Sequence, residues 1–484
     1  MPRIGALLLL AAGALAGGDP GDALALEEAA FKEGWCKKLH AAATWAERHA
    51  LKLQAIRLWE AVLAVDPEDD NARRKLGWQK SRRGWGAVPD RRRDLAGWLD
   101  SNAAALPELA EQESSIRLWT LQERLRLGRT HAERAPEWAE AQFEAALELD
   151  PDCAEARDRL GFVKEGTRWI LAIHRDAIRD LPERLRLVKE AAAQPVDTAV
   201  GKEFRPEERA AGLPLARVES RIASILTTGD EATARDLAET AERALRFLLT
   251  ILPRDAAELD PLDGRRFTFL HLRTREEYLA VVGADATLDD EAKAFASRLK
   301  GARVFGYASA FEAATPEEAR DVVANQVVLG SARLLGSPAD RNTPWLAESL
   351  ALLATQTLLG TAGQISVRHE HTTEGGRPSD RAMELQGWQT LLRTLVTEGR
   401  DPALAEILTT PRNALETEKS AKAWSVVDYL AFVQPEPGRR TLVAFMTGAT
   451  ADPAERWENA VRAGLRLTPA RFEKLWRQWV LDAY

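Results

Sequence analysis

The sequence predicts a mainly helical protein in which N-terminal helical-hairpin repeats precede an α+β domain. An internal repeat in the first third predicts the hairpins, and a later alternation of short strands with long amphipathic helices predicts the second domain. The chain of 484 residues is longer than one hydrophobic core usually organises, and its 45% hydrophobic and 29% charged residues are typical of globular proteins. We therefore expect two or three folded domains.

The first residues have the pattern of an export signal. Arg3 precedes an apolar run over 4–16 that ends in the small-x-small triplet Ala-Leu-Ala. The run is too short to span a bilayer, and no later segment is long and apolar enough to do so. We expect a signal peptide over 1–16 and a mature chain without a membrane span, located in the periplasm, the cell envelope or outside the cell. An uncleaved N-terminal helix is the alternative.

The charge balance bears on the class of partner. A formal net charge of -8 argues against a nucleic-acid binder, because neutralising phosphates requires a concentrated basic surface. The basic run from Lys75 to Arg93 is the local exception; we interpret it as a solvated face balanced by nearby acids rather than as an anion-binding patch. The two cysteines, Cys36 and Cys153, could pair if the fold brings them together, and the sequence leaves this open.

An internal repeat appears when the sequence is shifted by 84 residues. The segment Glu-Ala-Val-Leu-Ala-Val-Asp-Pro at 60–67 matches Glu-Ala-Ala-Leu-Glu-Leu-Asp-Pro at 144–151, and Leu-Gly-Trp at 76–78 matches Leu-Gly-Phe at 160–162. Each copy predicts a helix stopped by Asp-Pro, a turn and a second helix ended by Gly. A Trp follows each copy, which suggests a small hairpin that packs an aromatic ring. The pattern resembles tetratricopeptide repeats, although 84 residues exceed one such unit, and we expect further degenerate hairpins between the copies within a repeat region over 24–175.

Four prolines interrupt charged stretches after this region and predict an interdomain linker over 176–214. The following domain divides into a β/α part over 215–315 and a helical part over 316–484. In the first part we expect strands at 218–227, 267–272 and 304–308, and helices at 230–252 and 274–282, the second started by a Thr cap. In the second part a polar interruption lies between Gly360 and Pro378.

The residues with the most chemical information lie on two predicted helices of the helical part. Asn325-Gln326-Val327-Val328-Leu329 belongs to the first helix, and Glu348 follows on the second after eighteen intervening residues. This layout resembles that of gluzincins, zinc peptidases with His-Glu-x-x-His on one helix and a Glu ligand on the next. The order of strands and helices over about 215–484 also resembles the peptidase MA-like branch of that superfamily.

The resemblance implies a role for each matching position. It places Asn325 and Leu329 at the two His ligand positions, Gln326 at the general base and Glu348 at the third ligand. Leu has no lone pair, a neutral amide is a poor zinc ligand and Gln cannot accept a proton, so only Glu348 suits the chemistry. We therefore expect a gluzincin-like fold with a degenerate site that holds no zinc and no other cofactor. Two unrelated amphipathic helices are the alternative interpretation.

These observations predict an exported pseudo-peptidase that binds a protein or peptide through its repeats and its former active-site cleft. A second hypothesis is an active metallopeptidase or other hydrolase with a rearranged site that uses Glu348, Tyr429 or the His369/His371 pair. That pair lies in the polar interruption, where a solvated loop is the simpler interpretation. A third hypothesis is a purely structural scaffold of the envelope.

Overall fold

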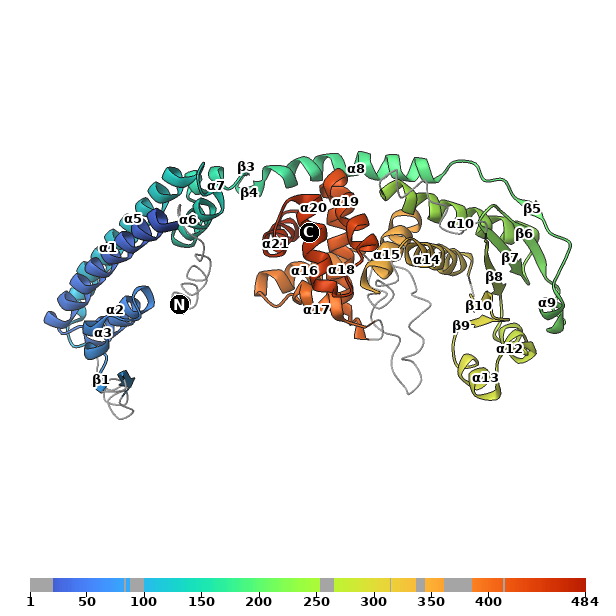
Figure 1. The fold of residues 1–484 in the computed structure, drawn as a ribbon, viewed down its shortest axis with the longest axis horizontal. Helices are drawn as coiled ribbons and strands as arrows, with labels where there is room; N and C mark the ends of the chain where they lie inside the picture. The colour runs from blue at the N-terminus through green and yellow to red at the C-terminus, as the bar shows by residue number, and fades with distance from the viewer. Residues whose placement is uncertain are drawn as a thin grey trace. The chain divides into compact units, whose positions relative to one another are not determined.

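The computed structural model describes residues 21–81, 84–87, 100–252, 265–313, 315–336, 344–360, 385–411 and 414–484 (Figure 1). The described residues divide into two compact units, one up to Trp169 and one from Ile170 to Tyr484. The protein is mainly helical, with one small mixed sheet in the second unit. None of its described helices is long and apolar enough to cross a membrane. The predicted signal peptide at 1–16 lies outside the described residues.

The first unit contains one series of elements twice: a long helix, a shorter helix, a one- to two-turn helix and a two-stranded hairpin. The bounds of the last four elements recur 84 residues later, for example 52–65 and 136–149. The long helix fills the rest of each copy, so the further hairpins expected between the copies are absent from the described residues. The first copy comprises α1 (Gly21–Arg48), α2 (Lys52–Val65), α3 (Asp70–Lys75), β1 (Trp78–Ser81) and β2 (Gly84–Ala87). The second comprises η1 (Ala103–Ala105), α5 (Leu106–His131), α6 (Pro136–Leu149), α7 (Ala154–Arg159), β3 (Phe162–Glu165) and β4 (Arg168–Leu171).

The predicted helix stops are confirmed in both copies. α2 and α6 end where Asp66 and Asp150 adopt extended backbone angles, because the following Pro cannot continue a helix. Gly77 and Gly161 follow α3 and α7 with φ of +83° and +82°, a conformation that costs glycine little. The same local chemistry therefore gives the same turn twice.

The hairpin of the first copy packs aromatic rings against cations, as the recurring Trp suggested. The indole of Trp85 donates to Asp70 at 3.0 Å, and the Lys80 ammonium lies 5.4 Å from the Trp85 ring centre. Lys80 also pairs with Asp70, and Lys75 pairs with Glu47. The interpretation of the basic run as a face balanced by acids is thus confirmed for these described members.

The second unit begins with a helix where the sequence predicted a linker. Residues 176–214 contain most of α8 (Ala172–Ala192), β5 (Ala199–Val200) and α9 (Pro206–Ala210). α8 includes Pro182, yet Ala177, Val188 and Ala192 are buried on the face that packs against the core of the second unit. Burial of this helical stripe outweighs the local cost of the proline, and the linker prediction is wrong over α8.

A six-stranded mixed sheet follows, in the order β5-β6-β7-β8-β10-β9. Its central strands β7, β8 and β10 are parallel, and β6 and β9 pair antiparallel with β7 and β10. The predicted strand at 267–272 is confirmed as β8, whereas the segment at 218–227 forms two strands. The strands are β6 (Ala216–Glu219), β7 (Ala223–Thr227), β8 (Phe267–Leu272), β9 (Gly301–Val304) and β10 (Ala308–Glu312).

The predicted strand at 304–308 is wrong at its centre, because residues 305–307 form the turn between β9, which ends at Val304, and β10, which begins at Ala308. Phe305 and Gly306 have φ of +54° and +73°, which reverses the chain. The Asp285 carboxylate accepts the Phe305 N–H at 2.6 Å and holds this aromatic residue in the left-handed region. An interaction over twenty residues therefore fixes a turn that local sequence preferences do not reveal.

Helices cover both faces of the sheet and continue to the end of the chain (Figure 1). The Thr cap predicted for the helix after β8 is confirmed, since Thr274 accepts the Glu277 N–H in a capping box. One continuous core joins α8, α10, α14, α15 and the C-terminal helices, and a smaller core lies beneath α12. The helices are α10 (Glu231–Ile251), α12 (Arg275–Ala284), α13 (Asp290–Ala296), α14 (Pro316–Leu335), α15 (Trp345–Leu359), α16 (Leu385–Glu398), α17 (Leu404–Thr409), α18 (Thr417–Asp428), the π-helix η5 (Tyr429–Val433), α19 (Pro435–Thr447), α20 (Pro453–Leu465) and α21 (Pro469–Ala483).

Candidate functional site

The four candidate positions lie on α14 and α15, which pack directly against each other and against α10 (Figure 1). α14 starts after β10, where Thr315 accepts the Glu318 N–H and Pro316 occupies the first helical position. α15 ends at Gly360, whose φ of +74° suits the C-terminal cap. Local capping therefore sets where each helix begins or ends relative to the candidate residues.

The three positions that match zinc ligands are buried. Asn325, Leu329 and Glu348 are 0%, 5% and 2% exposed, whereas Gln326 is partly exposed. Asn325 and Leu329 lie one turn apart on α14, and Glu348 lies in the first turn of α15. The structure thus brings these positions onto one pair of packed helices and withdraws three of them from solvent.

These side chains do not fit a zinc ion. Leu329 offers no donor atom, and the amide oxygen and nitrogen of Asn325 have no hydrogen-bond partner among the described residues. A neutral, buried amide contributes little to zinc binding, and no group of three or more His, Cys, Asp or Glu side chains that could hold a metal occurs in the described ranges.

The surroundings of Glu348 are strongly apolar. α15 is buried on nearly every side, and its first residue, Trp345, packs against Phe445 and Trp457 with ring centres 5.4 and 6.0 Å away. A helix that is hydrophobic all round belongs to the centre of a core. Glu348 is therefore a carboxyl group held among apolar side chains, and it interacts there with another group of the protein.

Tyr429, the tyrosine considered for a rearranged site, is the first residue of η5. It is fully buried, and its hydroxyl accepts a hydrogen bond from the Gln434 amide at 3.2 Å. Burial raises the pKa of Tyr429 to about 12. The group stays protonated near neutral pH, and its ring packs edge-on against His174 and Trp479. Sequence reasoning found the residue but not the π-helix that carries it.

A series of polar contacts that the sequence did not reveal begins at Asp428, the residue before Tyr429. Tyr484 lies 3.3 Å from the Asp428 carboxylate and 3.0 Å from Ser425, which in turn accepts the Trp476 indole N–H at 3.0 Å. Asp428 keeps a small accessible surface but is surrounded by protein, and this burial raises its pKa to about 7, against a smaller lowering by the Tyr484 hydroxyl. The contact joins residues 56 positions apart, so only the folded chain brings them together.

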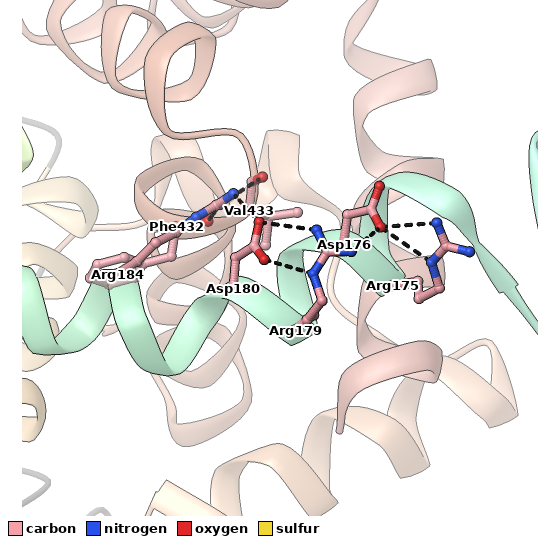
Figure 2. Close-up of polar contacts among 7 residues, drawn as sticks. All are labelled: Arg175, Asp176, Arg179, Asp180, Arg184, Phe432 and Val433. Carbon is pink, nitrogen blue, oxygen red and sulfur yellow. Dashed lines mark hydrogen bonds and ion pairs between the residues drawn. The ribbon is translucent and has the colours of Figure 1, made fainter.

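α8 carries a second polar network missed by the sequence analysis (Figure 2). On its surface Asp176 pairs with Arg175 at 3.0 Å and Asp180 pairs with Arg179 at 2.9 Å. Arg184 turns toward η5 and donates to the carbonyl oxygens of Phe432 and Val433 (Figure 2). These contacts tie α8 to the last turn of the π-helix.

A buried His and Asp pair anchors the beginning of α8. His174 Nδ1 lies 2.7 Å from Asp482 Oδ2, and both side chains are almost completely buried. The same carboxylate oxygen accepts the Leu171 N–H at 3.3 Å, and its other oxygen accepts the Gln478 amide. The last turn of α21 therefore fixes the first turn of α8.

The remaining histidines and the cysteines form no group of three or more candidate metal ligands within the described part of the chain. His369 and His371 lie outside the described ranges. His40 pairs with Asp69 at 2.7 Å, in keeping with a structural role. Cys36 and Cys153 are both free thiols, and burial raises the pKa of Cys36 to about 11.

Comparison of the chain with protein-family models, with curated proteins and with solved structures gives no match.

Proposed function

We propose that the chain is an exported, non-catalytic protein related to the gluzincin peptidases, and that it acts by binding a protein or a peptide. One observation carries this proposal. Asn325, Leu329 and Glu348, which have the spacing of a zinc site, lie buried on two directly packed helices, but Leu329 has no donor atom and Asn325 offers only a neutral amide.

The order of elements supports a relation to that superfamily. A sheet with parallel central strands precedes α14, β10 runs into α14 across a short connection, and α15 follows and packs on α14. Asn, Gln and Leu are similar in size to His and Glu, and Asn325 and Leu329 are buried. A helix pair can therefore retain its packing after the metal chemistry is lost.

The duplicated helical modules of the first unit support a binding role. Helical repeats present extended surfaces, and their usual task is to hold another chain. The apolar run over 4–16 supports export. Under this proposal the repeats supply recognition, and the peptidase-like part contributes a second surface rather than a reaction.

Metal content and activity test the proposal first. We expect the purified full-length mature chain to retain no zinc after dialysis, as measured by elemental analysis, and to leave unfolded casein uncleaved with or without added zinc. Stoichiometric zinc together with cleavage that a chelator abolishes would refute it.

A restored site tests the relation to gluzincins directly. The triple variant Asn325→His, Gln326→Glu and Leu329→His should bind one zinc ion tightly, because the two new His residues lie four positions apart on α14. Adding Glu348→Gln to the triple variant should weaken that binding by about tenfold or more, since a ligand is removed. Circular dichroism provides the folding control for both variants. If the triple variant folds but does not bind zinc, the helices do not have the gluzincin arrangement.

A further inference from the structure

Two arginines meet at the C-terminal end of η5. Arg184 from α8 donates to the carbonyl oxygens of Phe432 and Val433 (Figure 2), and Arg439 from α19 donates through Nε to the carbonyl oxygen of Ala431 at 3.3 Å. The last carbonyls of a helix have no partner within it, so both side chains act as caps. These capping hydrogen bonds use only one nitrogen of each guanidinium group.

The positive charge at this place exceeds the nearby negative charge. Asp180 lies 3.6 Å from Arg184, but it also pairs with Arg179 at 2.9 Å (Figure 2). Arg439 forms no ion pair with any described residue. Burial lowers the pKa of Arg439, the acid Glu436 partly opposes this, and the charge of Arg184 lowers the pKa further. The two guanidinium groups bind consecutive carbonyl oxygens of the same helix end, so they lie near each other and repel.

The two terminal nitrogens of Arg439 are available to bind a ligand. Neither Nη atom donates a hydrogen bond to a described residue, and neither belongs to the buried polar atoms that lack a partner. Both Nη atoms therefore keep some accessible surface, while the rest of the side chain is partly buried and held by the Ala431 carbonyl. A guanidinium group fixed in this way presents a planar pair of donors that matches a carboxylate.

We propose that Arg439, with Arg184 beside it, forms a binding site for a carboxylate group of an acidic peptide segment. A single negative charge offsets the mutual repulsion of the two arginines. A doubly charged phosphate would bring more charge than the place can balance, because Asp180 and Glu436 already lie nearby. This inference does not depend on the gluzincin relation, since α8, η5 and α19 carry all the residues involved.

The experiment uses the full-length mature chain and a fluorescent Glu-rich peptide, with binding followed by fluorescence anisotropy at low salt. We expect saturable binding that weakens as salt is added, and no binding of the matching Gln-rich peptide. Arg439→Gln should weaken binding by about tenfold or more, because a charge-assisted pair of hydrogen bonds is lost. Arg440→Gln is the matched control. Arg440 is the next residue on α19, is exposed and bonds through Nε to the Glu436 carbonyl, and its removal should change affinity by less than about threefold.

Three results would overturn the proposal. They are an absence of peptide binding by the wild-type chain, an equal loss in Arg439→Gln and Arg440→Gln, and an affinity that Arg439→Gln leaves unchanged. Inorganic phosphate and acetate serve as competitors. Displacement of the peptide by phosphate at concentrations where acetate has no effect would assign the site to phosphate instead and would refute the carboxylate assignment.

Discussion

Asp428 should lower the stability of the second unit at neutral and alkaline pH, and Asp428→Asn should remove that cost. The carboxyl group is surrounded by protein, and its pKa in the folded chain is raised to about 7 from an ordinary value of 3.8. Asn has the same shape, keeps an oxygen that accepts from the Tyr484 hydroxyl and carries no charge to bury. The substitution therefore isolates the cost of ionising this position.

The direction of the pH effect follows from the two pKa values. Below pH 3.8 the carboxyl is protonated in both states and costs nothing. As pH rises toward 7, the unfolded chain releases the proton while the folded chain retains it, so the free energy of unfolding falls. The difference between the two values corresponds to about 4 kcal/mol at 1.36 kcal/mol per tenfold change in proton affinity. The partial exposure of Asp428 makes this an upper figure.

Urea unfolding with pulsed hydrogen exchange and mass spectrometry can measure the effect on peptides from 414–484. We expect Asp428→Asn to raise the free energy of unfolding at pH near 8 by about 2 to 4 kcal/mol and to have little effect at pH near 4. Asp180→Asn is the control: Asp180 lies partly exposed on α8, and its pKa is lowered by the Arg179 hydrogen bond, so its removal should give no alkaline gain. A stability difference for Asp428→Asn that is independent of pH, or a loss at alkaline pH, would refute the reasoning.

Two further predictions concern packing and buried charge. Gly438→Ala should destabilise the second unit by about 3 kcal/mol in thermal denaturation, because an added Cβ would overlap the Leu430 carbonyl oxygen. Gly283→Ala should instead stabilise it by about 1 kcal/mol, because an added Cβ there meets no atom within 4 Å. His174→Leu should cost about 3 kcal/mol, because the buried Asp482 carboxylate loses a hydrogen-bond donor, and His174→Asn, which restores an N–H at the place of Nδ1, should recover part of the loss. Equal melting temperatures for the two His174 variants would contradict the assigned hydrogen bond.

The parts of the fold that were predicted correctly depend on short-range signals. The Asp-Pro stops at 66–67 and 150–151, the glycines after α3 and α7, the Thr274 cap and the strand at 267–272 are each decided within a few residues. Two of the errors have the opposite cause. α8 forms despite Pro182 because residues distant in the sequence form a core that covers one of its faces. The turn at Phe305 depends on Asp285, twenty residues earlier.

The candidate site also combines features that the sequence predicts with features that only the folded structure reveals. Spacing along the chain was enough to place Asn325, Leu329 and Glu348 on two helices, and the structure adds that these helices pack together and bury all three. The polar contacts that start at Asp428 and the Arg439 site could not be predicted from the sequence. Their properties arise from burial and from contacts with residues of other helices, and neither leaves a local pattern in the sequence.

The hairpins of the two repeat copies differ in the burial of their last residues. The hairpins β1–β2 and β3–β4 share their bounds after the shift, yet Gly86 is exposed where its counterpart Ile170 is buried. The next residue of the second copy, Leu171, donates its N–H to Asp482, and α8 starts immediately afterwards. Ile170 and Leu171, the apolar residues at the end of this hairpin, are thus buried directly before α8 begins. The first copy, with Gly and Ala at these positions, has no comparable apolar side chains to bury.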